Sequence, residues 1–172
     1  MNFDLLYNNV VKGCPICNGT GTIEVTDTSI CFCDCMKFYI TATQMLELGV
    51  PLKYIMGYTP VEVDLKKRVY FVFKDDQYAF NIFITLAMEP HKRRMFLTDS
   101  MQMYYLSNYQ EKDGVMIHNL GLETKKDSSL VLYRVIKEVE ERGLYGIFSF
   151  AINRENLDTY YSKFIVSRIN GF

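Results

Sequence analysis

The chain has 172 residues, of which 49% are hydrophobic, enough for one core or for a small metal-held module plus one modest domain. Its formal net charge of -1 excludes a global field that attracts nucleic acid or membranes, so any nucleic-acid contact has to be local. No apolar run approaches the roughly 18 residues that span a bilayer. The start, Met-Asn-Phe-Asp-Leu-Leu, lacks the basic and apolar regions of a signal peptide, so we expect an intracellular protein.

Residues 1–12 begin with an amphipathic segment, and the cysteine window follows directly. All five cysteines lie in residues 14–35, and Cys14 and Cys17 are separated from a second group by a glycine-containing loop. Paired thiolates of this kind can converge on one tetrahedral Zn²⁺ ion with little chain to order. We expect the ligands to be Cys14, Cys17, Cys33 and Cys35, with Cys31 as the substitute. A closed four-thiolate site leaves no position for water, so the zinc is expected to be structural.

Two alternatives to a metal site remain open. Disulfides are typical of small secreted scaffolds, which does not fit a chain without an export signal. Free structural thiols would leave unexplained why five cysteines fall within 22 residues and none in the other 150 (172 minus 22). The β-branched residues from Thr20 to Thr26 predict a strand inside the window.

A helix is predicted over residues 36–48, where apolar side chains recur at helical spacing before Gly49. An extended connector over 49–66 follows, and its extended stretch starts with Val50-Pro-Leu-Lys-Tyr54. We therefore expect three parts: a zinc-binding module with its helix (1–48), the connector (49–66), and a core (67–172).

From residue 67 onward, short apolar runs alternate with helical patterns. Strands are predicted at 69–73, 94–98, 114–118 and 145–150, and helices at 77–88, from Asp99 or Ser100 to 109, from Asp127 or Ser128 to 142, and at 153–169. Such alternation predicts an α/β fold with a parallel sheet covered by helices on both faces.

Five short motifs occur in order along the chain: Cys14 to Gly21 (Cys-x-x-Cys-x-Gly-x-Gly), Gly49 to Tyr54 (Gly-Val-Pro-Leu-Lys-Tyr), Val115 to Gly121, Glu141 to Gly143 (Glu-Arg-Gly), and Ile165 to Arg168 (Ile-Val-Ser-Arg). In this order the chain resembles the phage and bacterial helicase loaders of the DnaC/IstB-like AAA+ group, over nearly its whole length. The resemblance implies a AAA+-like core, of the P-loop NTPase kind, that is shorter at its C-terminal end than in its relatives.

The segment after the first strand of this core departs from the family's pattern. An ATPase of this group needs Gly-x-x-x-x-Gly-Lys-Ser/Thr there, because backbone N–H groups wrap the phosphates. In this chain the segment contains no glycine, and Phe80 and Asn81 stand about where the Lys and the hydroxyl residue belong. Asp75 and Asp76 add negative charge where a polyphosphate would lie.

The third and fourth strands depart as well. His118 and Asn119 replace the Mg²⁺-binding and water-activating acids, and Ala151 falls near the position of an expected Asn. We therefore expect a pseudo-ATPase: a non-catalytic protein that has lost the Walker A and Walker B residues and binds no ATP. His118 is expected to be a filler for an abandoned acid rather than a metal ligand or acid–base group.

By resemblance, the expected function is a DNA replication accessory factor, encoded by a phage or mobile element, that binds a hexameric replicative helicase through its zinc module. Its expected location is the cytoplasm of a bacterial cell, including a phage-infected host. Arg168 matches the family arginine that acts on a neighbour's site, so a partner contact is expected there. Lys92, Arg93 and Arg94 form a basic turn that can touch the phosphates of single-stranded DNA weakly.

A second hypothesis keeps the fold and changes the partner. The near-neutral charge and the 13 tyrosines and 12 phenylalanines favour protein binding over DNA binding. The chain would then be a loader-derived adaptor or inhibitor that binds another machine, such as RNA polymerase or a nuclease. A genuine enzyme is disfavoured, because no glycine-rich loop, paired acids or histidine-bearing zinc site is present.

Overall fold

A computed structural model describes residues 3–26, 29–88, 94–105, 112–123 and 128–171. The chain divides into two compact units, which we call the first unit (Met1–Ile55) and the second unit (Met56–Phe172).

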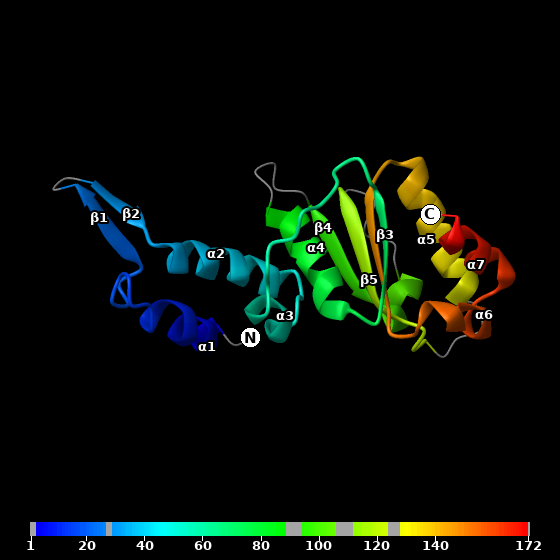
Figure 1. Ribbon diagram of the computed structural model, residues 1–172, viewed down its shortest axis with the longest axis horizontal. Coiled ribbons are helices and arrows are strands. Elements are labelled where there is room, and N and C mark those ends of the chain that lie inside the picture. Colours follow the sequence, from blue (N-terminus) through cyan, green and yellow to red (C-terminus); the bar gives the residue numbers. More distant parts are fainter. Residues whose placement is uncertain (1–2, 27–28, 89–93, 106–111, 124–127, 172) are drawn as a thin grey trace. The chain divides into compact units, whose positions relative to one another are not determined.

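The first unit consists of helices and a two-stranded hairpin. The helix α1 (Phe3–Tyr7) runs directly into the π-helix η1 (Asn8–Lys12), and together they bury Leu6 and Val11. The antiparallel strands β1 (Thr22–Thr26) and β2 (Ser29–Phe32) follow, and α2 (Asp34–Glu47) begins just after β2. Figure 1 shows the hairpin extending away from α1 and α2.

Two elements of the first unit differ from expectation. The strand β2 was not predicted, because its four residues, Ser29–Phe32, are too few to show a clear pattern. The helix α3 (Leu52–Met56) lies where an extended connector was expected, and the backbone N–H of Tyr54 donates to the carbonyl of Pro51 in its first turn. Proline fixes φ at a helical value, so it suits the start of a helix as well as a connector.

The second unit is built on a four-stranded parallel sheet, which confirms the predicted α/β fold. Its strands are β3 (Val69–Phe73), β4 (Met95–Asp99), β5 (Gly114–Leu120) and β6 (Tyr145–Phe150), in the spatial order β3-β6-β5-β4. Every pairing is parallel. All four carboxyl ends therefore lie at one edge of the sheet.

Helices cover both faces of this sheet, as predicted. In Figure 1, α4 (Asp76–Met88) lies on one face, while α5 (Ser128–Glu141), α6 (Leu157–Tyr160) and α7 (Lys163–Asn170) lie on the other. The latter face holds the main core, in which α5 and α7 bury apolar side chains against Phe148 and Phe150. Because strand residues alternate between faces, Val69, Phe71 and Phe73 belong to this core as well.

Two predicted helices of the second unit are wrong in extent. Instead of one helix over 153–169, the chain forms the 3-10 turn η3 (Arg154–Asn156), α6 and α7. The break falls at Tyr161, which takes an extended conformation and buries its ring in the core, where Tyr161 donates a hydrogen bond to Glu123. The helix predicted from residue 99 or 100 to 109 is a 3-10 helix, η2 (Ser100–Tyr105), and residues 106–109 lie outside the described part.

None of the helices in the described segments combines the length and apolar character needed to cross a membrane.

Candidate functional site

Four cysteines of the first unit come together at the base of the hairpin, and we call Cys14, Cys17, Cys33 and Cys35 the cysteine cluster. Their Sγ atoms all lie within 4.8 Å of one another. The Sγ atoms of Cys14 and Cys33 are 3.8 Å apart, and those of Cys17 and Cys35 are 3.5 Å apart. Thiolates at about 2.3 Å from one tetrahedral ion would be about 3.8 Å apart, so the cluster can hold a metal ion.

The backbone of the first cysteine pair is shaped by residues with positive φ. Asn18 has φ of 48° and Gly19 of 82°, and they turn the chain back over Cys17. A Cβ at Gly19 would lie 3.0 Å from the backbone oxygen of Lys12, so this position favours glycine on both counts. The backbone N–H of Gly21, also at positive φ (76°), donates to the Sγ of Cys17 at 3.3 Å.

The second cysteine pair is set by the start of α2. Cys33 caps this helix in an extended conformation, and its carbonyl accepts hydrogen bonds from the N–H groups of Met36 and Lys37. Cys35 therefore lies in the first helical turn, where the helix dipole favours negative charge. The N–H of Cys33 donates to the carbonyl of Gly21, which joins the two halves of the cluster.

Hydrogen bonding prepares one thiol for metal binding. Burial of Cys17 by itself would raise the pKa of its thiol, but hydrogen bonds from the Gly21 N–H, the Cys35 thiol and the Gly19 N–H outweigh it and lower this pKa to about 6. Burial and hydrogen bonds shared with the other cysteines raise the pKa of Cys35. Thiolate is the form that binds metals, so the lowered pKa of Cys17 favours this residue as a ligand.

Cys31 lies outside the cluster. It is exposed on β2, opposite Ile23, whereas Cys17 and Cys33 are buried. All five cysteines are free thiols in this structure. The geometry therefore brings together the four cysteines selected from the sequence and leaves the substitute out.

The turn between Cys14 and Cys17 and the hairpin that follows it expose large apolar side chains. Ile16, Ile30 and Phe32, which we call the hairpin patch, are 69%, 70% and 55% exposed. Ile30 and Phe32 lie on one face of β2, because they are two residues apart. Ile16 and Ile30 line one shallow hollow, and Ile30 and Phe32 line another. The sequence did not predict this surface, because the exposure of these side chains depends on the packing around them.

The segment after β3 leads into α4, and the side chain of Asp75 caps the first turn of this helix. The Oδ1 of Asp75 accepts a hydrogen bond of 2.9 Å from the N–H of Tyr78, and its carbonyl accepts one from Ala79. Phe80 is fully buried and packs on the ring of His118, with 5.5 Å between centroids. Asn81 is 5% exposed and exchanges hydrogen bonds with Thr59.

The ends of the other strands are bonded to one another. The amide of Asn119 donates to the Oδ2 of Asp99 at 2.6 Å, and the Nδ1 of His118 lies 3.7 Å from the same oxygen. The hydroxyl of the buried Ser149 donates to the Oδ1 of Asp76 at 2.6 Å. The polar side chains at this edge of the sheet thus support the fold.

Arg168 lies on α7 and forms an ion pair with Glu140 of α5. Beside it, a surface hollow of about 450 Å³ is lined by Tyr133, Phe164 and Arg168, among others. Phe164 is 59% exposed, and the centroid of its ring lies 4.3 Å from the centroid of the Tyr133 ring. An arginine expected to reach a partner's site is therefore held in place by a carboxylate of its own unit.

The basic turn is only partly described. Lys92 and Arg93 lie outside the described residues. Arg94 is exposed, its backbone N–H donates to Asp113 at 2.7 Å, and its Nε lies 3.7 Å from the same carboxylate.

Comparison with known proteins adds no relative: no family model matches the chain, and neither does any curated protein. The class that the geometry defines is an α/β protein with a four-stranded parallel sheet flanked by helices and a four-cysteine cluster that can hold a metal ion.

Proposed function

We propose that this protein is a non-catalytic DNA replication accessory factor, related to the DnaC/IstB-like helicase loaders, that binds a hexameric replicative helicase through its first unit. The observation that carries the proposal is the hairpin patch. A closed cysteine cluster supports a hairpin whose large apolar side chains point into solvent, and Ile16 and Ile30 are each about 70% exposed. Exposed apolar side chains gathered on one surface favour a protein partner.

The ion in the cysteine cluster is proposed to be zinc. Four thiolates in tetrahedral array select zinc or an iron–sulfur centre. The sulfur atoms, all within 4.8 Å of one another, are close enough to share a single ion, which favours zinc. With four protein ligands the ion has no open position, so its role is to fold residues 14–35.

The relationship to AAA+ proteins is supported by where the departures lie. The segments that would form an ATP site follow β3, β5 and β6, and these three strands are neighbours in the sheet. Their carboxyl ends lie at one edge, which is where the resemblance would place a single nucleotide site. That edge is also where ligands bind in open α/β sheets.

The absence of ATP turnover is supported by the contacts of the same residues. The carboxylate of Asp75 caps the start of α4, where a phosphate would need free N–H groups. Phe80 fills the core in place of a lysine. Calorimetric titration with ATP·Mg²⁺ is expected to give no heat of binding, and micromolar affinity with turnover would overturn this part of the proposal.

The partner is tested by measuring binding of the full chain to the purified host replicative helicase. Ile30→Asp is expected to weaken binding at least tenfold, because truncating or charging a central contact costs about 2 kcal/mol or more. Leu130→Asp is the matched control: Leu130 is 60% exposed on α5 of the second unit and should leave binding unchanged.

Either of two outcomes would contradict the proposal that the helicase is the partner. The wild-type chain would fail to bind it, or Ile30→Asp and Leu130→Asp would bind equally well. Affinity capture from native or infected cells that yields RNA polymerase or a nuclease instead, lost in Ile30→Asp, would favour an adaptor or inhibitor of that machine.

A further inference from the structure

Among the residues that the structure describes, the strand β3 lies at an edge of the sheet in the second unit and pairs with β6 on one side only. Two backbone hydrogen bonds fix which of its backbone groups face β6: the N–H of Gly146 donates to the carbonyl of Arg68, and the N–H of Lys74 donates to the carbonyl of Phe150. In a parallel pair, inward-facing residues alternate along the strand. Residues 68, 70, 72 and 74 therefore face β6, and the N–H and C=O groups of 69, 71 and 73 are directed to the other side.

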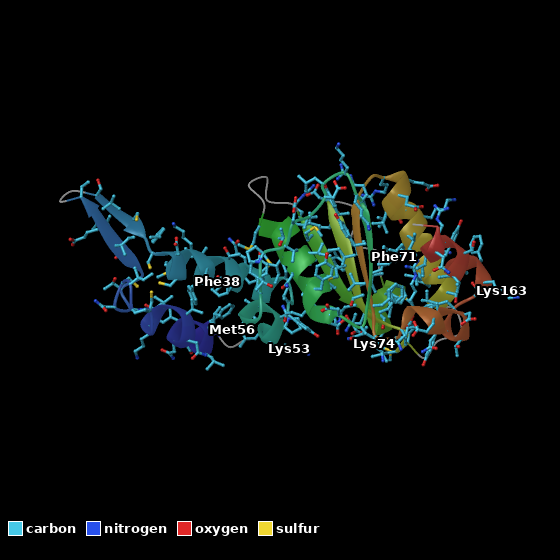
Figure 2. All side chains as sticks on the ribbon, in the orientation of Figure 1. Phe38, Lys53, Met56, Phe71, Lys74 and Lys163 are labelled. Atoms are coloured by element: carbon cyan, nitrogen blue, oxygen red, sulfur yellow. The ribbon has the colours of Figure 1, made fainter. Side chains whose placement is uncertain are left out.

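A groove follows this outer side of β3. It has a volume of about 120 Å³ and is lined by Lys67, Val69, Phe71, Phe73, Arg154 and Ile169. Small-molecule sites usually occupy roughly 300–1,000 Å³, so this groove suits one or two apolar side chains rather than a cofactor. Figure 2 labels Phe71 on this strand.

The two charged residues of the groove are both basic and both exposed. Lys67 lies two residues before β3, and its Nζ sits 5.2 Å from the ring centre of Tyr70. Arg154 lies 5.9 Å from the ring centre of Phe73, at the other end of the strand, and its Nε donates to Asn170. Within the described segments, neither cation forms an ion pair with a carboxylate. The groove is therefore apolar in its middle and positive at both ends.

We propose that the outer edge of β3 binds an extended segment of a partner protein as a fifth strand, with apolar side chains in the groove and carboxylates at its ends. Strand addition supplies main-chain hydrogen bonds for affinity and side-chain contacts for specificity. The five residues of β3 span about 17 Å, so the segment carries acidic residues about that far apart. This site lies in the second unit and does not depend on the metal or on the helicase.

The probe is a display library of random nine-residue peptides, selected on the immobilised full chain. Enriched peptides are expected to alternate apolar residues and to carry Asp or Glu near both ends. The double variant Lys67→Glu, Arg154→Glu should weaken their binding at least tenfold, because attraction becomes repulsion at both ends. A control of equal charge change, Lys12→Glu, Lys163→Glu, should bind as the wild type does; Lys163 lies apart from Phe71 in Figure 2.

Backbone pairing is tested on the best peptide itself. N-methylation of those alternate amides that would face β3 should abolish binding, whereas N-methylation of the other amides should not. No enrichment over the double variant, or binding indifferent to the methylated position, would overturn the proposal. A dimer of the free chain that dissociates in the double variant would assign the edge to a second copy instead and would also overturn it.

Discussion

Chelation of the proposed zinc is expected to unfold the cysteine window while the sheet of the second unit stays intact. The reason is how little else holds residues 14–35 together. Apart from the cysteines, Ile23 is the hydrophobic residue that packs on the cluster, and it is only partly buried. Every residue of β2 is exposed, and an isolated two-stranded hairpin is marginal in water.

The magnitudes decide which interaction dominates. Full burial of a side chain such as Ile23 contributes about 1.5–3 kcal/mol, and its partial burial contributes less. A structural zinc contributes about 10–16 kcal/mol at neutral pH in zinc-finger peptides. The second unit has a separate core of more than a dozen buried residues, including Phe148 and Phe150, so it does not need the metal.

The assay is hydrogen exchange on the full chain, with metal content measured in parallel. Before treatment we expect about one zinc per chain, and after chelation we expect loss of amide protection in 22–26 and 29–32 but not in 145–150. Cys17→Ser should lower metal affinity at least a hundredfold, which is about 2.7 kcal/mol, whereas Cys31→Ser should change nothing. Protection of the hairpin that persists in metal-free protein would refute the reasoning.

Three further outcomes are expected in the second unit. Phe150→Ala should lower the free energy of unfolding by about 3–5 kcal/mol in urea titrations, because Phe150 is fully buried, whereas the exposed Phe164→Ala should cost far less. Asp75→Ala should cost about 1 kcal/mol by removing the cap of α4, and an unchanged midpoint would contradict that role. Burial, with the charge of Asp64, raises the pKa of Tyr70 from 10.0 to about 12. The folded state therefore keeps the phenol proton of Tyr70 to a higher pH than the unfolded state does. The stability that this difference contributes is complete below pH 10 and is lost as the pH rises from 10 to 12. Tyr70→Phe should make the fall in stability over that range shallower.

The strands of the second unit could be predicted because their burial matches their sequence. The segment 69–73 is a continuous apolar run and 145–150 is apolar apart from Ser149, and in the structure both are strands of a parallel sheet covered on both faces. A short run of this kind is typical of a strand in the interior of such a sheet. The positions of the helices α4 and α5 could be predicted because their apolar residues recur at helical spacing.

The elements that were predicted wrongly or not at all depend on tertiary contacts. The break between α6 and α7 depends on Tyr161, whose ring is buried and whose hydroxyl bonds to Glu123, 38 residues earlier in the chain. Nothing within residues 153–169 carries that information. In the first unit, β2 is stabilised by its pairing with β1 and by the cysteines on either side, so its four residues do not show the pattern of a buried strand.

The candidate site was also predictable only in part. The cysteine spacing suffices to select Cys14, Cys17, Cys33 and Cys35, because close pairs have few ways to meet. The hairpin patch could not be selected, because exposure of Ile30 depends on which elements fail to cover it. Sequence alone treats an isoleucine as a core residue, and only the packing shows that this one is not.

Polar side chains at the carboxyl edge of the sheet in the second unit are bonded to one another. Asp75 caps α4, Asp76 accepts from Ser149, and Asn119 donates to Asp99. Each of these bonds holds a strand end or a helix start. Introducing one residue of the ATPase pattern would not create a phosphate site, because the lysine, the metal-binding acid and the free N–H groups are needed together. This requirement supports the proposal that the protein acts by binding rather than by ATP turnover.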